Sequence, residues 1–201
     1  MRDADIRKAL ICKLSNKHGA SARAQIIEEL GVDHGGVRID VAVIDDFMHG
    51  YEIKSNKDTL RRLSEQANAY SKVFTTVTIV VGDRHVDEVT NYIPDWWGIL
   101  QATWIENRAA VNLRHRRRAR INPTPESLLV ARLLWRDEAL AELERLGLDK
   151  GIRSKSRDEL YQRLAIHVPS RDLQKIVSKR LVTRNDWRNS SSSSPTQEDH
   201  S

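Results

Sequence analysis

Apolar and polar residues alternate or run together along the first half of the chain in patterns that predict strands and helices. Alternation over residues 37–44 and 50–55 is typical of two strands joined by the turn DDFMH. The continuous apolar run TTVTIVVG predicts a buried strand, and apolar positions at helical spacing predict a helix over 58–70. Further helices are expected over 2–14, 21–30 and 86–93, with a strand after PDWWG and a strand pair or basic extended segment over 108–122.

The second half of the chain predicts a separate helical region. Asn122-Pro123 interrupts the pattern, and a long helix is expected over 124–147. Two more helices are expected, one opened by a capping box at Ser156 and Glu159 and one starting at Ser170. The serine-rich end is low in complexity. The predicted organisation is an α/β core over 1–122, a basic helical region over 123–188 and a disordered tail over 189–201.

The two alternating segments also carry charged residues on their polar positions. The odd positions of both segments are apolar, so we expect that face to pack on a core. A hairpin that pairs the apolar faces then brings Asp40 beside Glu52 and Lys54. Paired carboxylates suit Mg²⁺ or Mn²⁺, and a neighbouring ammonium can stabilise charge on a phosphate. The alternative is a solvated salt bridge between Lys54 and one carboxylate.

These residues resemble a known family. Asp40 followed by Glu52-Ile53-Lys54 is similar to the core motif of the PD-(D/E)xK nuclease superfamily, although Ile39 stands where that motif has proline. Gln66 and Tyr70 resemble the Q-x-x-x-Y motif of its RecB-like branch. The stretches GYEIKS, DTLRRL and PDWWGI are similar to an uncharacterised bacterial and phage family within that superfamily.

The resemblance implies a restriction-endonuclease-like α/β/α core with a central mixed sheet, followed by C-terminal helices. It implies a Mg²⁺-dependent deoxyribonuclease that hydrolyses phosphodiester bonds. The implied metal ligands are Asp40, Glu52, the carbonyl of Ile53 and Glu29, with Glu28 as the alternative to Glu29. The implied catalytic residues are Asp40, Glu52, Lys54, Gln66 and Tyr70.

The charge distribution points to a polyanionic partner. The chain has 201 residues and a formal net charge of +5, and the segment RHRRRAR concentrates arginines. We therefore expect DNA as the partner and leave a homodimer open. The alternative function is a non-catalytic DNA-binding or protein-interaction module on the same fold, in a defence, regulatory or mobile-element system. The arginines expected to contact nucleic acid are Arg114, Arg116, Arg117, Arg118 and Arg120.

Composition places the protein in the cytoplasm in this interpretation. No apolar run is long enough to cross a bilayer or to act as a signal peptide, so no membrane partner is expected. Cys12 is the only cysteine, which excludes an internal disulfide and a thiolate zinc site.

Overall fold

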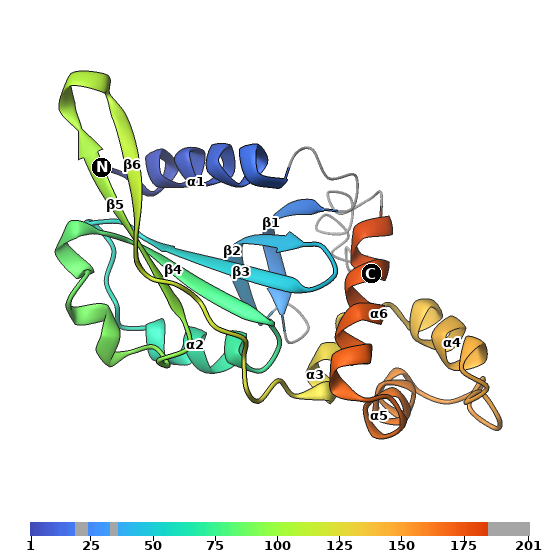
Figure 1. Cartoon of the computed structure of the whole chain (residues 1–201). Coiled ribbons are helices and arrows are strands. Elements are labelled where there is room, and N and C mark those ends of the chain that lie inside the picture. Colours follow the sequence, from blue (N-terminus) through green and yellow to red (C-terminus); the bar gives the residue numbers. More distant parts are fainter. Residues whose placement is uncertain (19–23, 33–35, 185–201) are drawn as a thin grey trace, which may run out of the picture.

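A six-stranded mixed sheet lies at the centre of the structure, a computed structural model that describes residues 1–18, 24–32 and 36–184 (Figure 1). The strands follow one another in chain order across the sheet. The β3–β4 and β4–β5 pairs are parallel, and the other three pairs are antiparallel. The strands are β1 (Gln25–Val32), β2 (Val37–Ile44), β3 (Met48–Lys54), β4 (Thr76–Gly82), β5 (Gly98–Ile105) and β6 (Ala110–Arg117).

Helices cover both faces of the sheet and extend beyond one end of it (Figure 1). Helix α1 lies on one face and α2 on the other, while the last four helices gather beside the sheet. The helices are α1 (Asp3–His18), α2 (Leu63–Ser71), α3 (Ser127–Ala131), α4 (Arg136–Arg145), α5 (Arg157–His167) and α6 (Ser170–Thr183), with short 3-10 turns η2 (Asp83–His85), η3 (Glu88–Asn91) and η4 (Glu106–Arg108). This arrangement confirms the predicted α/β class with a central mixed sheet and C-terminal helices.

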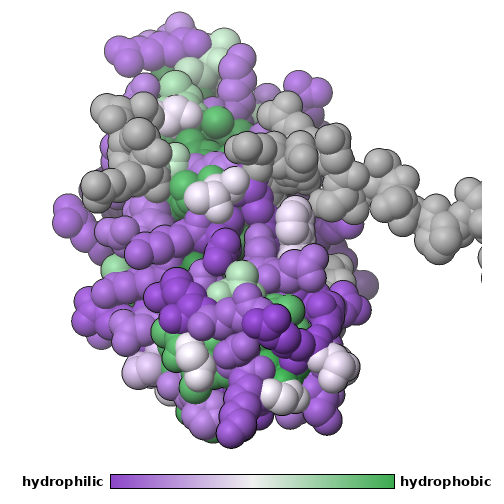
Figure 2. Space-filling model, turned by 90° about the vertical axis from the view of Figure 1, so that its right-hand side faces the viewer, coloured by the Kyte–Doolittle hydropathy of each residue, from purple (hydrophilic) through white to green (hydrophobic). Residues whose placement is uncertain are grey.

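Two apolar cores hold these layers together. Ile6, Leu10 and Leu14 follow each other at four-residue spacing on α1, so one stripe of that helix is buried against the sheet. The larger core lies on the other face and continues from the sheet and α2 into the C-terminal helices. The surface of the end that carries those helices is mostly hydrophilic (Figure 2). None of the described helices has the length and apolar character that crossing a membrane requires.

The β2–β3 hairpin forms as predicted, but the expectation of one buried face is wrong. Val41 and Val43 pack toward α1, as expected for the odd positions. Ala42 and Ile44 are buried on the opposite face, in the core that also contains α2. Ile39 joins that second core as well. Helices on both faces bury both sets of side chains, so alternation identifies the strand without identifying a solvated side.

The helix expected over 21–30 is wrong, because the described part of that segment forms β1. Ile26 and Ile27 are β-branched, and pairing with β2 buries Ile27 and Leu30 in a way that an isolated helix would not. Residues 21–23 lie outside the described residues. The expected tail over 189–201 also lies outside them.

The long helix expected over 124–147 is also wrong, because it is divided into α3 and α4. The backbone N–H of Trp135 donates to Glu138 Oε2 at 2.8 Å, which starts α4 with a side-chain cap. Arg184 donates to the carbonyl oxygen of Leu133 at 2.8 Å, so the interruption is stabilised by a residue far along the chain. The helix expected over 86–93 is reduced to the 3-10 turn η3, and α2 starts at Leu63 rather than near residue 58.

Candidate functional site

The hairpin register brings the expected carboxylates together. Val41 and Tyr51 form the last pair between β2 and β3, and Asp40 and Glu52 are the next residues beyond that pair on the two strands. Asp40 Oδ2 accepts a hydrogen bond from the backbone N–H of Ile53 at 2.7 Å. The predicted neighbourhood of Asp40, Glu52 and Lys54 is therefore present in the structure.

Asp40 has a counter-cation that the sequence did not reveal. Arg7 Nη2 on α1 lies 2.6 Å from Asp40 Oδ1, and Arg7 Nη1 donates to the Asp40 carbonyl oxygen at 2.9 Å. The same guanidinium lies 3.1 Å from Glu29 Oε1 and 3.3 Å from Asp3 Oδ1. Arg7 therefore ties α1 to the sheet through ionic hydrogen bonds. No local pattern identifies it, since it is 33 positions from Asp40 in the chain.

Glu52 is buried, with an exposed fraction of 2%. Its Oε1 atom accepts hydrogen bonds from Lys54 Nζ at 2.5 Å and from Gln66 Nε2 at 2.7 Å. Burial, and then the charge of Asp40, raise the pKa of Glu52 to about 7 against the opposing effect of Lys54. The carboxyl group therefore changes its protonation state near neutral pH. Its Oε2 atom has no hydrogen-bond partner among the described residues.

Helix α2 carries the two residues of the Q-x-x-x-Y motif toward this cluster. Gln66 Nε2 also lies 3.4 Å from Tyr70 Oη, and the Tyr70 hydroxyl donates to the carbonyl oxygen of Arg38 at 2.5 Å. Burial raises the pKa of Tyr70, and the nearby Glu52 adds to that effect. Tyr70 also stacks on Trp97, with ring centroids 6.3 Å apart. Within this geometry, Tyr70 fastens α2 to the sheet.

A polar pocket of about 450 Å³ opens over the cluster, between α1, α2 and the hairpin. A divalent cation in this pocket remains a prediction. Most of the carboxylate oxygens that would bind it already have partners within the protein. Arg7 and the Ile53 N–H hold both oxygens of Asp40, while Glu52 offers one free oxygen. Within the residues that the structure describes, no three His, Cys, Asp or Glu side chains are arranged to hold a metal ion. The residues therefore do not fit a resident cation unless Arg7 leaves Asp40.

The expected metal ligand Glu29 lies on β1, not on a helix. Its side chain is half-exposed and pairs with Arg7. Its backbone φ of 55° is in the left-handed region, which is uncommon for a residue other than glycine. Glu28, the alternative, lies 3.9 Å from the same guanidinium. Both carboxylates therefore surround Arg7, where they help to neutralise it.

The five arginines expected at a nucleic-acid surface divide into two groups. Arg117 donates to the carbonyl oxygens of Trp97 and Pro94 at 2.7 and 3.1 Å, and Arg120 donates to the carbonyl oxygen of Asp95 at 3.1 Å. These two arginines hold the end of β6 and the segment after it against the turn before β5. The remaining three are exposed and have no ion-pair or hydrogen-bond partner among the described residues: Arg114, Arg116 and Arg118.

Helix α1 adds positive charge beside β6. His115 on β6 has its pKa lowered by partial burial and then by the charges of Lys13, Arg118 and Lys17, and α1 packs beside β6. Lys13 and Lys17 are exposed and have no ion-pair partner among the described residues. We call Lys13, Lys17, His115 and Arg118 the α1–β6 basic cluster. Its helical half was not identifiable from the sequence, because only folding places α1 beside β6.

Comparison with known proteins indicates a phage family. Residues 1–197 match the family described as Bacteriophage P4 protein cII. The protein named Protein cII from Enterobacteria phage P4 is 32% identical over 101 residues, which are 50% of this chain and 38% of that protein. The aligned region thus covers well under half of that relative. No solved structure gives a significant match.

These matches overturn the nuclease interpretation. The assignment to the PD-(D/E)xK superfamily, the hydrolysis of phosphodiester bonds and the deoxyribonuclease activity are wrong, because the family matched over nearly the whole chain is a different one. The expectation of a phage protein is confirmed at the level of the family. Two carboxylates and a lysine at this spacing in a hairpin do not require a metal ion, because cations of the same chain can neutralise the carboxylates. Here those cations are Arg7 and Lys54.

Proposed function

Because the chain belongs to the Bacteriophage P4 protein cII family, we propose that it is a non-catalytic, DNA-binding regulatory protein of phage origin. This corresponds to the alternative function drawn from the sequence. The observation that carries the proposal is the α1–β6 basic cluster, where cations from two elements gather without carboxylate partners in the described part of the chain. Unpaired cations that lie close together repel each other, and a phosphate backbone relieves that repulsion.

The distribution of ion pairs supports the same surface. Part of the basic charge of the C-terminal helices is neutralised within the protein; Arg145 and Arg180, for example, both bind Glu142, at 2.7 and 2.6 Å. On β6, Arg114 and Arg116 extend the unpaired charge beyond the cluster. Exposed cations without ion pairs among the described residues lie on both α1 and β6, which pack beside each other. This is the surface that we assign to the DNA backbone.

The carboxylate cluster has a structural role in this proposal. Asp40, Glu52, Arg7 and Lys54 neutralise one another and connect α1, the hairpin and α2. The pocket around them is lined by six carboxyl groups and four cationic side chains, and this balance disfavours phosphate there. In this proposal the basic cluster binds DNA, and the carboxylate cluster holds the helices against the sheet. Substitutions in one cluster should therefore leave the role of the other unchanged.

The test is a salt titration of DNA binding measured by fluorescence anisotropy in EDTA. Each phosphate contact contributes about 0.7 to 0.9 to the slope of log affinity against log salt concentration. We expect the double variant Lys13→Gln, Arg118→Gln to reduce the slope by about 1.4 to 1.8. The matched control Lys175→Gln, Lys179→Gln removes the same charge from α6 and should leave the slope unchanged.

Two outcomes would overturn the proposal. The first is the absence of salt-dependent binding at low ionic strength, which would favour the protein-interaction alternative. The second is an equal loss of slope in both double variants, which would mean that overall charge rather than this surface attracts DNA. Gel analysis of parallel samples with Mg²⁺ or Mn²⁺ in place of EDTA should show intact DNA.

A further inference from the structure

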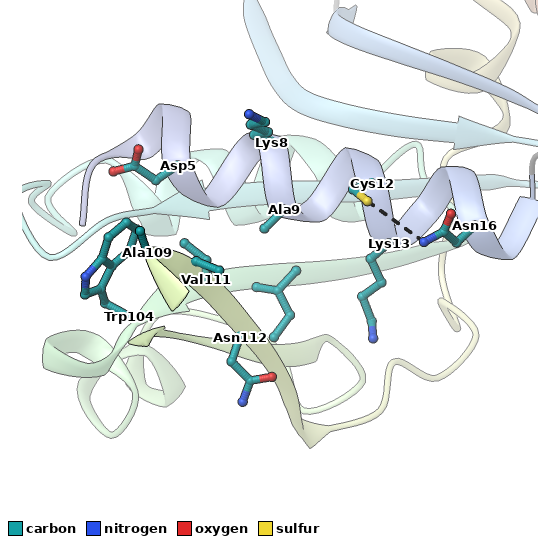
Figure 3. A pocket seen from close by; sticks show the side chains of 12 residues that line it. Asp5, Lys8, Ala9, Cys12, Lys13, Asn16, Trp104, Ala109, Val111 and Asn112 are labelled. Atoms are coloured by element: carbon teal, nitrogen blue, oxygen red, sulfur yellow. Dashed lines mark hydrogen bonds between the residues drawn. The ribbon is translucent and has the colours of Figure 1, made fainter. Parts of the chain in front are cut away.

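A groove of about 640 Å³ runs between α1 and the β5–β6 hairpin, next to the α1–β6 basic cluster (Figure 3). Ala9 on α1 and Ala110 and Val111 on β6 contribute short side chains to its lining. Small side chains at these positions leave space between the helix and the strand. The volume lies within the range of pockets that take a small organic group.

The charge of the groove favours an anionic occupant. Lys8 and Lys13 line it and have no ion-pair partner among the described residues. Asp5 is the one lining carboxylate, and it already accepts a hydrogen bond from the backbone N–H of Arg2 at 2.8 Å. Lys13 also belongs to the basic cluster, so the positive surface continues from the cluster into the groove.

The groove also presents an aromatic ring and two amides. Trp104 lines one end of it and is 38% exposed, although it is a large apolar side chain. Its partner in the sheet is Val111, which lines the groove as well. Asn16 and Asn112 place amide groups along the lining. An exposed ring beside amides and ammonium groups matches the three parts of a nucleotide, namely the base face, the base edge and the phosphate.

The position of the ring distinguishes single strands from duplexes. A duplex stacks its bases inside and offers no base face to a side chain, whereas an unpaired base stacks on an aromatic ring. Along α1, the lining extends from Asp5 to Asn16, eleven positions that span roughly 16 Å at about 1.5 Å per residue. That length accommodates a short stretch of a single strand.

We propose that single-stranded DNA occupies the groove between α1 and β6, with a base stacked on Trp104 and phosphates beside Lys8 and Lys13. This inference rests on the proposed DNA-binding function and narrows it to unpaired DNA at a defined place. The strand leaves the groove toward His115 and Arg118, where the basic cluster contacts further phosphates.

Cys12 provides a direct reporter of occupancy. It is the only cysteine of the chain, it is exposed, and it lines the groove between the two lysines. The rate of its alkylation by iodoacetamide, a neutral reagent, is measured for the full chain with no DNA, with an oligothymidylate, and with a duplex of equal length. We expect the single strand to slow alkylation at least fivefold at saturation and the duplex to slow it less than twofold.

Substitution of the ring tests the stacking contact separately. Removing one base–aromatic stack weakens binding by roughly five- to a hundredfold. We expect Trp104→Leu to lose single-strand affinity by that factor and Trp104→Phe to retain most of it. Trp135→Leu, which alters another exposed tryptophan at the start of α4, should leave affinity unchanged.

The outcomes separate this inference from the proposed function. Single-strand binding with unprotected Cys12, or duplex protection as strong as single-strand protection, would overturn the groove assignment and leave DNA binding in place. Normal affinity of Trp104→Leu would also overturn it. Absence of binding to either form of DNA would instead overturn the proposed function itself.

Discussion

Replacing Glu52 with glutamine tests whether burial or the ion pair with Lys54 controls the charge of this side chain. The folded protein raises the Glu52 pKa from 4.5 to about 7, chiefly by burial. The folded state therefore holds this proton more tightly than the unfolded chain. It follows that the free energy of unfolding contributed by Glu52 is fully present below about pH 4.5 and is lost as the pH rises through about 7.

The amount of stability that depends on pH follows from the same change in the pKa of Glu52. Each tenfold change is worth about 1.4 kcal/mol, so a rise from 4.5 to about 7 corresponds to about 3 kcal/mol. Most of this loss falls between about pH 5 and pH 8. Glutamine has nearly the same shape and no titration, so Glu52→Gln should remove this slope. The lost contact with Lys54 adds an offset that does not vary over this pH range.

Urea unfolding of the wild-type protein and Glu52→Gln, in EDTA at four pH values from 5 to 8, measures the difference directly. The wild-type protein should lose about 2 to 3 kcal/mol relative to the variant across this range. His49 has a lowered pKa through burial and changes stability in the opposite direction, but it is common to both proteins. Glu65→Gln, an exposed change in the same pocket, serves as the control. A difference that stays constant with pH would refute the reasoning and show a permanently ionised pair.

Three further substitutions test individual contacts. Arg7→Ala frees an oxygen of the carboxylate cluster, so titration calorimetry should show Mg²⁺ binding at least about tenfold tighter than in the wild-type protein. Arg184→Met removes this partner from the half-buried carboxylate of Glu138, and urea unfolding should show a loss of about 1.5 to 3 kcal/mol. Tyr70→Phe leaves the Arg38 carbonyl without its hydroxyl donor, which should lower the free energy of unfolding by about 1 to 3 kcal/mol.

The hairpin and its carboxylates were predictable because a strand register follows from local pattern. Once the strands over 37–44 and 50–55 pair antiparallel up to Val41 and Tyr51, Asp40 and Glu52 follow directly beyond that pair. The partner that neutralises Asp40 was not predictable in the same way. Arg7 reaches it from a helix 33 positions away, and apolar periodicity says only which side of that helix is buried. A sequence motif therefore predicts which side chains lie close together. The charges that surround them depend on residues far away in the chain, which only the fold brings near.

The basic surface shows the same limit. The arginine-rich segment predicted five contacts with nucleic acid, and the structure uses Arg117 and Arg120 to hold a turn. The strand register decides this division, because a bulge near Ile99 and Leu100 places Arg117 opposite Ile99. Lys13 and Lys17 join the surface only because α1 packs beside β6. The positive charge of this surface was predictable from the sequence. The residues that form it were not, because they depend on how α1 packs beside β6.

The wrong prediction of a helix at β1 involves Glu29, and substitutions of this residue provide a last test. Sequence favoured a helix over 21–30, but Glu29 lies on a strand with a left-handed φ of 55°. Pairing with β2 is interrupted at Glu29, between the Glu28–Val41 and Leu30–Ile39 pairs. That conformation costs an L-residue about 1 to 2 kcal/mol relative to glycine. Glu29→Gly and Glu29→Ala both lose the half-exposed pair with Arg7, so their difference isolates the backbone.

Glu29→Gly should therefore be more stable than Glu29→Ala by about 1 kcal/mol in urea unfolding. In a helix the order reverses, because glycine in a helix is about 1 kcal/mol less favourable than alanine. In a regular strand glycine is also the less favourable residue, by roughly 0.5 to 1 kcal/mol. A more stable alanine variant would contradict the left-handed backbone at Glu29. It would also remove the reason for the break in pairing that turns this carboxylate toward Arg7.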